Sequence, residues 1–195
     1  MTQWRTTPKA TGVMRRWLMA SGSLSARLAA TGSVFAVQVL QQGRTALSSD
    51  EAQALGLGQR RVGYAREVLL RVDGRAVVFA RSVTAHGDAV GAWRSVRGLG
   101  TRPLADVLFK RSGIARQPLA YRLLRRHAPL QRHVMKSWAA GAKSLGVDAA
   151  VPARRSVFVR RGAALLVMEV FVAQANGAPV SKPICLNPSF WKDVS

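Results

Sequence analysis

The feature that most constrains the fold is the dipeptide Asp73-Gly74, which lies between RVGYAREVLLRV (61–72) and RAVVFARSVTA (75–85). Asp-Gly between two segments rich in β-branched and aromatic residues is the strongest short-range signal of a β-hairpin. Because side chains alternate along a strand, one face of the first strand carries Tyr64, Arg66, Val68 and Leu70. The hairpin therefore places one arginine, Arg66, among large apolar side chains.

A second hairpin is predicted near the C-terminal end, where RRSVFVRR (154–161) and ALLVMEVFVA (164–173) flank a turn near Gly162. In the second of these strands, Glu169 shares a face with Leu165, Val167 and Phe171. Arg66 and Glu169 thus each lie on a strand face whose other residues indicate burial.

Burying an isolated charge is costly, so such groups are usually paired or contact a ligand. One interpretation is structural: Arg66 and Glu169 form an ion pair with each other, or their faces are exposed to solvent. The other is functional: a pocket with a cation at one end and a carboxylate elsewhere, suited to a small acid that carries a hydroxyl. Arg81, in VVFARSV, is a third candidate by the same reasoning. The residues alone leave both interpretations open.

The rest of the chain predicts a mixture of helices and strands. Val13, Trp17, Leu24 and Leu28 recur as on one face of an amphipathic helix that ends at Gly32. We expect a strand at 33–40, a loop with a helical turn at 43–60, helices at 88–99 and from Pro103 to Arg111, and one or two helices within 121–147. These elements define one domain at 13–173, between a flexible N-terminus at 1–12 and a C-terminal extension at 174–195.

The charge of the chain suggests an anionic partner, with 30 Lys+Arg against 9 Asp+Glu and a net charge of +21. Nucleic acid is disfavoured, because no recognition module is evident and only 7% of the residues are aromatic. The pairs Arg125-Arg126 and Arg154-Arg155 are interpreted as solvated faces. His86, His127 and His133 are dispersed and Cys185 is the single cysteine, so no metal site is expected.

Export and membrane insertion are also disfavoured. The segment after Arg15-Arg16 has a poor apolar core for a signal peptide, and the longest uncharged stretch, 28–42, is too short and polar to span a bilayer. We therefore expect a cytoplasmic protein without stable membrane insertion.

Several segments, in their order and spacing, resemble the chorismate pyruvate-lyases, which make 4-hydroxybenzoate for ubiquinone biosynthesis. They are WLMASGSLSARLAATGSVFAVQVLQQG (17–43), YAREVLLRVDG (64–74), FARSV (79–83), GTRPLADVLF (100–109) and RRSVFVRRGAALLVMEVFV (154–172). The resemblance implies an α+β fold in which a six-stranded antiparallel sheet and helical flaps enclose a buried ligand pocket. Two departures are a longer stretch between Phe109 and Arg154 and an extended tail after Ala173.

The resemblance also implies roles for particular residues. By position in these motifs, Arg66 grips the ring carboxylate, Glu169 contacts the ring hydroxyl, and Arg81 is a further pocket arginine that binds or polarises the leaving enolpyruvyl group. Leu104 is a flap residue at the ligand, and Leu24 stands at a second flap position where the family usually has Met.

The implied reaction removes pyruvate from chorismate, and no metal or other cofactor is expected because aromatisation of the ring drives the elimination. Whether Glu169 removes the C4 proton or only positions the substrate, while the hydrogen passes within the substrate to the enolpyruvyl group, stays open at this point. The alternative function is a non-catalytic, effector-sensing domain of the same fold that binds small aromatic acids. For the enzyme, the partners are chorismate and 4-hydroxybenzoate, and a monomer is favoured.

Overall fold

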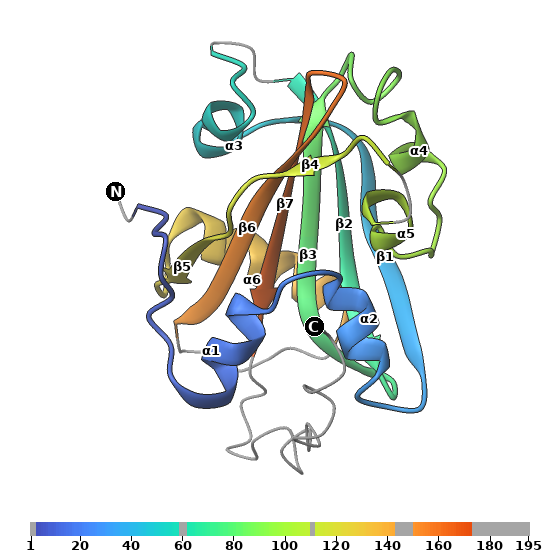
Figure 1. Cartoon of the computed structure of the whole chain (residues 1–195). Coiled ribbons are helices and arrows are strands. Elements are labelled where there is room, and N and C mark those ends of the chain that lie inside the picture. The colour runs from blue at the N-terminus through green and yellow to red at the C-terminus, as the bar shows by residue number, and fades with distance from the viewer. Residues whose placement is uncertain (1–2, 59–61, 110–111, 143–149, 173–195) are drawn as a thin grey trace.

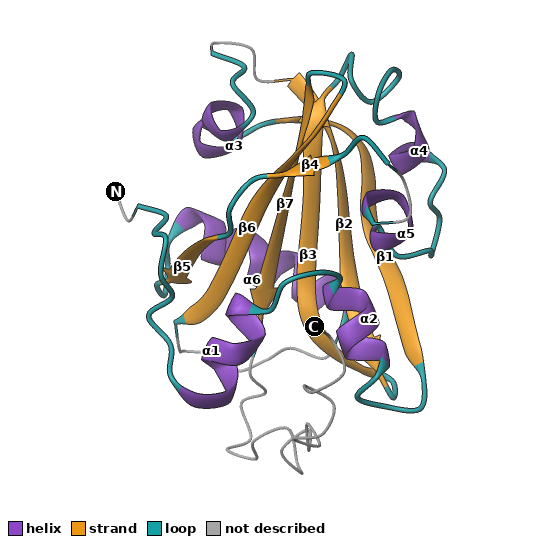
Figure 2. Cartoon of the chain, in the orientation of Figure 1, coloured by secondary structure: helices purple, strands orange, loops and turns teal. Residues whose placement is uncertain are grey.

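A strongly twisted antiparallel sheet forms the centre of the molecule, with helices on both of its faces (Figures 1 and 2). The computed structural model describes residues 3–58, 62–109, 112–142 and 150–172. Its strands are β1 (Phe35–Ala46), β2 (Val62–Val72), β3 (Arg75–Ala85), β4 (Ala115–Arg116), β5 (Ala120–Leu124), β6 (Val151–Arg160) and β7 (Ala163–Phe171). Its helices are α1 (Gly12–Met19), α2 (Leu24–Ala29), α3 (Ser49–Ala54), α4 (Arg94–Arg97), α5 (Ala105–Leu108) and α6 (Pro129–Gly141).

The strand order is β1-β2-β3-β7-β6-β4, and β5 pairs with β6 beside this path. The path of six strands agrees with the sheet that the resemblance implied, and β5 adds a seventh among the described residues. Both predicted hairpins are confirmed, and β3 and β7 join them at the middle of the sheet. The α+β prediction is therefore confirmed.

The turn chemistry explains why the first hairpin forms. Asp73 and Gly74 both have positive φ, 48° and 77°, which is the backbone that a tight two-residue hairpin turn requires. The Asp73 carboxylate also accepts hydrogen bonds from the backbone N–H groups of Ser33 and Val34, at 2.9 and 2.8 Å. One residue thus closes the β2–β3 hairpin and fixes the start of β1.

A β-bulge in this hairpin determines which side chains share a face. Val72 pairs with Arg75 and Arg71 with Ala76, but the register then shifts, so that Leu70 pairs with Val78. Beyond the shift, Arg66 lies opposite Ser82, and Arg81 lies opposite Glu67. Without the extra residue, Arg81 would pair with Arg66 on one face, because a shift of one residue moves a side chain to the other face.

The two faces of the sheet have separate cores. On one face, Val68, Leu70 and Val78 pack against Trp17, Leu18, Leu24 and Leu28 of α1 and α2. On the other, Leu69, Phe79 and Val170 pack against Val134 and Trp138 of α6. Figure 2 shows α1 and α2 in front of the sheet and α6 behind it. The first face carries Arg66, so α1 and α2 are the elements that cover it.

The predicted single helix from Val13 to Gly32 is wrong, because two short helices occupy this region. The chain leaves the helical conformation at Ala20, Gly22 has a φ of 72°, and the Ser23 hydroxyl caps α2 by accepting from the Ala26 N–H at 3.1 Å. Leu24 and Leu28 are buried as expected, whereas Val13 is 44% exposed. The break bends the segment over the sheet.

Other predicted boundaries also change. The strand expected at 33–40 continues to Ala46, and the helical turn expected within 43–60 is α3, which a Ser48–Glu51 capping box begins. The helix expected at 88–99 is mostly turns, with only the four residues of α4 helical, although Trp93 and Val96 are buried. Residues 120–124 form β5 rather than a helix, and the short strand β4 was not predicted.

The N-terminal segment, expected to be flexible, is attached to the sheet from residue 4. Arg5 forms an antiparallel bridge with Tyr121, and the Trp4 indole donates to Asp50 at 3.1 Å. The tail predicted at 174–195 lies outside the described residues. No helix in the described part of the chain is long and apolar enough to cross a membrane.

Candidate active site

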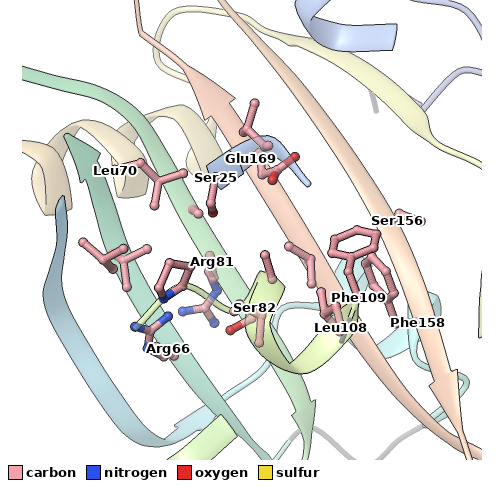
Figure 3. A pocket seen from close by; sticks show the side chains of 18 of the residues that line it. Ser25, Arg66, Leu70, Arg81, Ser82, Leu108, Phe109, Ser156, Phe158 and Glu169 are labelled. Atoms are coloured by element: carbon pink, nitrogen blue, oxygen red, sulfur yellow. The ribbon is translucent and has the colours of Figure 1, made fainter. Parts of the chain in front are cut away.

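A pocket lies on the face of the sheet that α1 and α2 cover, and it contains the predicted residues Arg66, Glu169, Leu24 and Leu104 (Figure 3). Its floor is formed by side chains of β2, β3, β6 and β7. Two segments cover it: residues 20–29, which include α2 and are here called the α2 flap, and residues 98–109, which include α5 and are called the α5 flap. The sheet and the helical flaps, which the resemblance implied as the walls of a ligand pocket, therefore lie next to one another in the structure.

Arg66 is almost completely buried, with 2% of its surface exposed. Its Nη2 donates to the carbonyl oxygens of Gly100 and Arg102, at 2.7 and 3.1 Å, so the side chain holds the α5 flap by its backbone. Its Nε is buried and has no hydrogen-bond partner among the described residues. Burial lowers the pKa of the guanidinium, although arginine stays charged at neutral pH. A buried cation with an unpartnered donor in a pocket is suited to an anionic ligand.

Glu169 does not pair with Arg66; its partner is Arg154. Arg154 Nε donates to Glu169 Oε2 at 2.5 Å. The interpretation of Arg66 and Glu169 as a mutual ion pair is therefore wrong. Figure 3 shows Arg66 and Glu169 at separate positions in the pocket, and strand spacing puts their Cα atoms about 12 Å apart.

Arg154 is a buried residue, which contradicts the sequence interpretation. It was assigned to a solvated face, yet only 1% of it is exposed. Its Nη1 donates to the carbonyl oxygens of Trp17, Leu18 and Ala20, at 3.1, 3.2 and 2.8 Å. These carbonyls lie at the end of α1, where helix geometry leaves them without partners. Arg154 therefore connects Glu169 to the backbone that leads into the α2 flap.

The flaps contribute apolar side chains to the pocket. Leu24 of the α2 flap is 3% exposed, and Leu104 precedes α5. Phe109 is 45% exposed and borders the pocket, with its ring edge-on to Phe158. An apolar, aromatic enclosure with a few polar groups is typical of a pocket for a small ring compound.

Arg116 is a second pocket cation, which the sequence did not reveal. It comes from the unpredicted strand β4, and its guanidinium carbon lies 5.3 Å from the centroid of the Phe158 ring. Within the described part of the chain it makes two long hydrogen bonds, to Ser156 Oγ and to the Gly22 carbonyl, both at 3.4 Å. Burial and the charge of Arg154 lower its pKa, while Glu169 opposes this effect.

Arg81 borders the pocket with its strand, but its guanidinium is held on the other face of the sheet. It forms ion pairs with Glu51 at 2.6 Å and with Glu67 at 2.5 Å. Its partner Glu67 is 1% exposed and also contacts His133 and Ser137 of α6. The expectation that Arg81 contacts the leaving group is therefore not compatible with this placement. The β-bulge at Leu70 is the reason that the Arg81 side chain lies on the face opposite to Arg66.

The contacts of Glu67 with Arg81, His133 and Ser137, here called the Glu67 cluster, predict how the stability of the fold depends on pH. Burial alone raises the pKa of Glu67, but hydrogen bonds and charges from His133 and Arg81 outweigh it and lower the pKa from 4.5 to about 2. Since the folded pKa is depressed, this contribution to stability is fully present above pH 4.5 and is lost as the pH falls toward 2. We expect Glu67→Gln to lower the free energy of unfolding by about 2 kcal/mol at pH 6.

The difference between wild type and Glu67→Gln should shrink as the pH is lowered from 4.5 to 2, which urea unfolding at pH 6, 4 and 3 measures. Asp88→Asn is the matched control: it removes a carboxylate from the loop after β3 and should show no such convergence. A difference that stays constant down to pH 3 would show that the Glu67 carboxylate is not held by these partners.

Comparison with known proteins connects this pocket with a family. A family model described as chorismate lyase matches residues 4–176. A probable chorismate pyruvate-lyase of Albidiferax ferrireducens is 60% identical over 162 residues, which cover 83% of this chain and 82% of that protein. A probable chorismate pyruvate-lyase of Aromatoleum aromaticum is 44% identical over 165 residues, covering 85% and 87% of the two chains. A third, from Pseudomonas fluorescens, is 37% identical and covers 98% of this chain and 92% of its own.

Solved structures give a more distant likeness. The C-terminal domain of PhnF has a TM-score of 0.52 at 18% identity, covering 70% of this chain and 82% of that domain. PhnF from Mycobacterium smegmatis also has a TM-score of 0.52, at 13% identity, covering 78% and 64% of the two chains. At such identities the likeness concerns the fold alone.

Proposed function

The chain belongs to the chorismate lyase family, and we propose on that premise that its pocket converts chorismate into 4-hydroxybenzoate and pyruvate, in the cytoplasm, as a step of ubiquinone biosynthesis. One observation carries the assignment of the pocket to this reaction: a buried arginine with an unpartnered Nε stands across an enclosed, mostly apolar space from a half-buried carboxylate. 4-Hydroxybenzoate has a carboxylate and a hydroxyl at opposite ends of one ring, which matches this arrangement.

Arg66 binds the ring carboxylate in this proposal. Its Nη2 is engaged by Gly100 and Arg102, and its Nε is a buried donor without a partner among the described residues. A carboxylate at this position accepts from Nε and neutralises a charge that burial has removed from water. Because the same guanidinium holds the α5 flap, a bound carboxylate and the flap backbone share one cation.

Glu169 accepts a hydrogen bond from the C4 hydroxyl of the substrate. It is the only carboxylate among the described residues that line the pocket. Its Oε2 is already engaged by Arg154, so the pair supplies a fixed acceptor beside the reacting carbon. We assign Glu169 a positioning role toward the substrate, which leaves the hydrogen transfer to the substrate itself.

The bond changes balance without a further reactant. The C3–O bond breaks, the C4 hydrogen passes to the methylene carbon of the enolpyruvyl group, and the ether oxygen becomes the carbonyl oxygen of pyruvate. The ring gains its third double bond and becomes 4-hydroxybenzoate. Leu24 and Leu104 cover the ring and exclude water, which strengthens the charge interactions of Arg66 and Glu169.

Incubation of the purified chain with chorismate deuterated at C4 tests both the reaction and the route of the hydrogen. We expect 4-hydroxybenzoate and pyruvate in equal amounts, followed by absorbance and by a pyruvate assay, and we expect the deuterium in the pyruvate methyl group by mass spectrometry. Folded protein without turnover would contradict the reaction. Turnover with loss of the label to solvent would assign the C4 proton to a base and make Glu169 that base.

A further inference from the structure

Chorismate carries two carboxylates, whereas its product 4-hydroxybenzoate carries one, and the second carboxylate belongs to the enolpyruvyl group. We propose that Arg116 binds this second carboxylate and is thereby the residue that distinguishes substrate from product. The inference rests on the proposed function, since it takes the ring carboxylate to lie on Arg66 and the C4 hydroxyl on Glu169.

The connectivity of chorismate fixes where the second carboxylate lies. The ring carboxylate is at C1, the hydroxyl is opposite at C4, and the enolpyruvyl ether is at C3, next to the hydroxyl. With the ring held between Arg66 and Glu169, the enolpyruvyl group therefore projects beside the Glu169 end of the pocket. A cation for its carboxylate has to be at that end, away from Arg66.

Arg116 meets this requirement. Its hydrogen bonds to Ser156 and to Gly22 place it between β6 and the α2 flap. Its contact Ser156 is two residues along β6 from Arg154, the partner of Glu169, and β6 lies beside β7, whereas Arg66 is on β2, three strands from β6. The charge of Arg116 therefore lies nearer to Glu169 than to Arg66. Figure 3 shows Ser156 and Phe158, its contacts on β6, grouped away from Arg66.

The contacts of Arg116 leave it able to take a new partner. Both of its hydrogen bonds are 3.4 Å long, at the weak end of the range for a guanidinium. Neither partner is charged, so a substrate carboxylate offers shorter, charge-assisted bonds. The rings of Phe158 and Phe109 support the guanidinium from the side, at 5.3 and 6.0 Å, and limit its movement.

Two other arginines of the site are already committed. Arg81 is held by two carboxylates behind the sheet, and Arg154 uses Nε and Nη1 on Glu169 and on three backbone carbonyls. Among the described residues that line the pocket, Arg116 is therefore the cation that can meet the enolpyruvyl carboxylate. It takes the role that the sequence gave to Arg81.

Arg116→Gln, which keeps a donor for Ser156 and removes the charge, tests the proposal. We expect kcat/KM for chorismate to fall about 10- to 100-fold, because a hydrogen bond to a charged group is lost. The Kd for 4-hydroxybenzoate, measured by calorimetry, should change less than threefold, since that ligand has no second carboxylate. Arg116→Lys, which restores the charge without the guanidinium fork, should recover part of kcat/KM.

Arg125→Gln is the matched control, because it removes the same charge from an exposed turn and should leave both constants unchanged. An equal loss of chorismate and 4-hydroxybenzoate binding in Arg116→Gln would overturn the proposal, as would unchanged kcat/KM. If Arg116→Gln does not fold, the same comparison of the two ligands is made with Arg116→Lys, where a loss confined to chorismate supports the proposal. Wild type without turnover would instead refute the proposed function itself.

Discussion

Replacing Arg66 with glutamine is expected to lower kcat/KM for chorismate by about 10²- to 10³-fold. It should raise the Kd for 4-hydroxybenzoate by a similar factor. The reason is that both ligands place their ring carboxylate on the same buried guanidinium, whose Nε has no other partner in the structure. Glutamine ends near the position of Nε, so it provides no charge and also loses the two hydrogen bonds that Nη2 donates to the α5 flap. Steady-state kinetics and calorimetric titration with 4-hydroxybenzoate measure the two losses.

Two comparisons separate this loss from a general disturbance of the fold. Arg44→Gln removes an exposed arginine from β1, and its constants should remain those of wild type. Arg116→Gln should affect chorismate alone, so the pair of variants assigns one carboxylate to each arginine. Wild-type affinity for 4-hydroxybenzoate in Arg66→Gln would mean that the ring carboxylate binds elsewhere.

Replacing Arg154 with methionine is expected to lower the free energy of unfolding by about 3–5 kcal/mol. The change leaves the Glu169 carboxylate without its cation and three backbone carbonyls at the end of α1 without their donor. For a chain of this length, the melting temperature should fall by roughly 6–20 °C. Urea unfolding followed by circular dichroism measures the free energy, and calorimetry measures the temperature.

Arg155→Met provides the control within the same strand. Arg155 points to the other face, where it pairs with Asp50 and stacks on Trp4 at 4.3 Å, and we expect its replacement to cost roughly 1 kcal/mol. In the double variant Arg154→Met/Glu169→Gln, part of the lost stability should return, because the unpaired carboxylate is gone. A loss below about 1 kcal/mol for Arg154→Met would show that the buried contacts carry little of the stability.

The parts of the fold that sequence predicted are those with local causes. Asp73-Gly74 determines a turn by its own backbone preference, and alternation along β2 and β7 correctly put Arg66 and Glu169 on apolar faces. The break between α1 and α2 also has a local cause, in Gly22 and in the Ser23 cap, but the apolar spacing across the break resembled one continuous helix.

The parts that sequence did not predict depend on contacts between distant segments. Arg154 is one of two adjacent arginines, a pattern that is typical of a solvent-exposed surface. It is nevertheless buried, because three carbonyl oxygens at the end of α1 accept its hydrogen bonds. Arg81 changes face through a single bulged residue, for which the strand sequence gives no sign. Arg116 belongs to a two-residue strand, too short for a periodic pattern.

The order of the strands also determines when the ligand site can form during synthesis of the chain. Ala80 of the first hairpin pairs with Glu169 of the last, so the two charged ends of the ligand site come from segments about 100 residues apart in the chain. A ribosome-bound chain that has emerged only as far as α6 holds Arg66 and the α5 flap but lacks β6 and β7, and with them Arg154 and Glu169. The binding site therefore cannot be complete until β7 has been translated, which is after nearly all of the described residues.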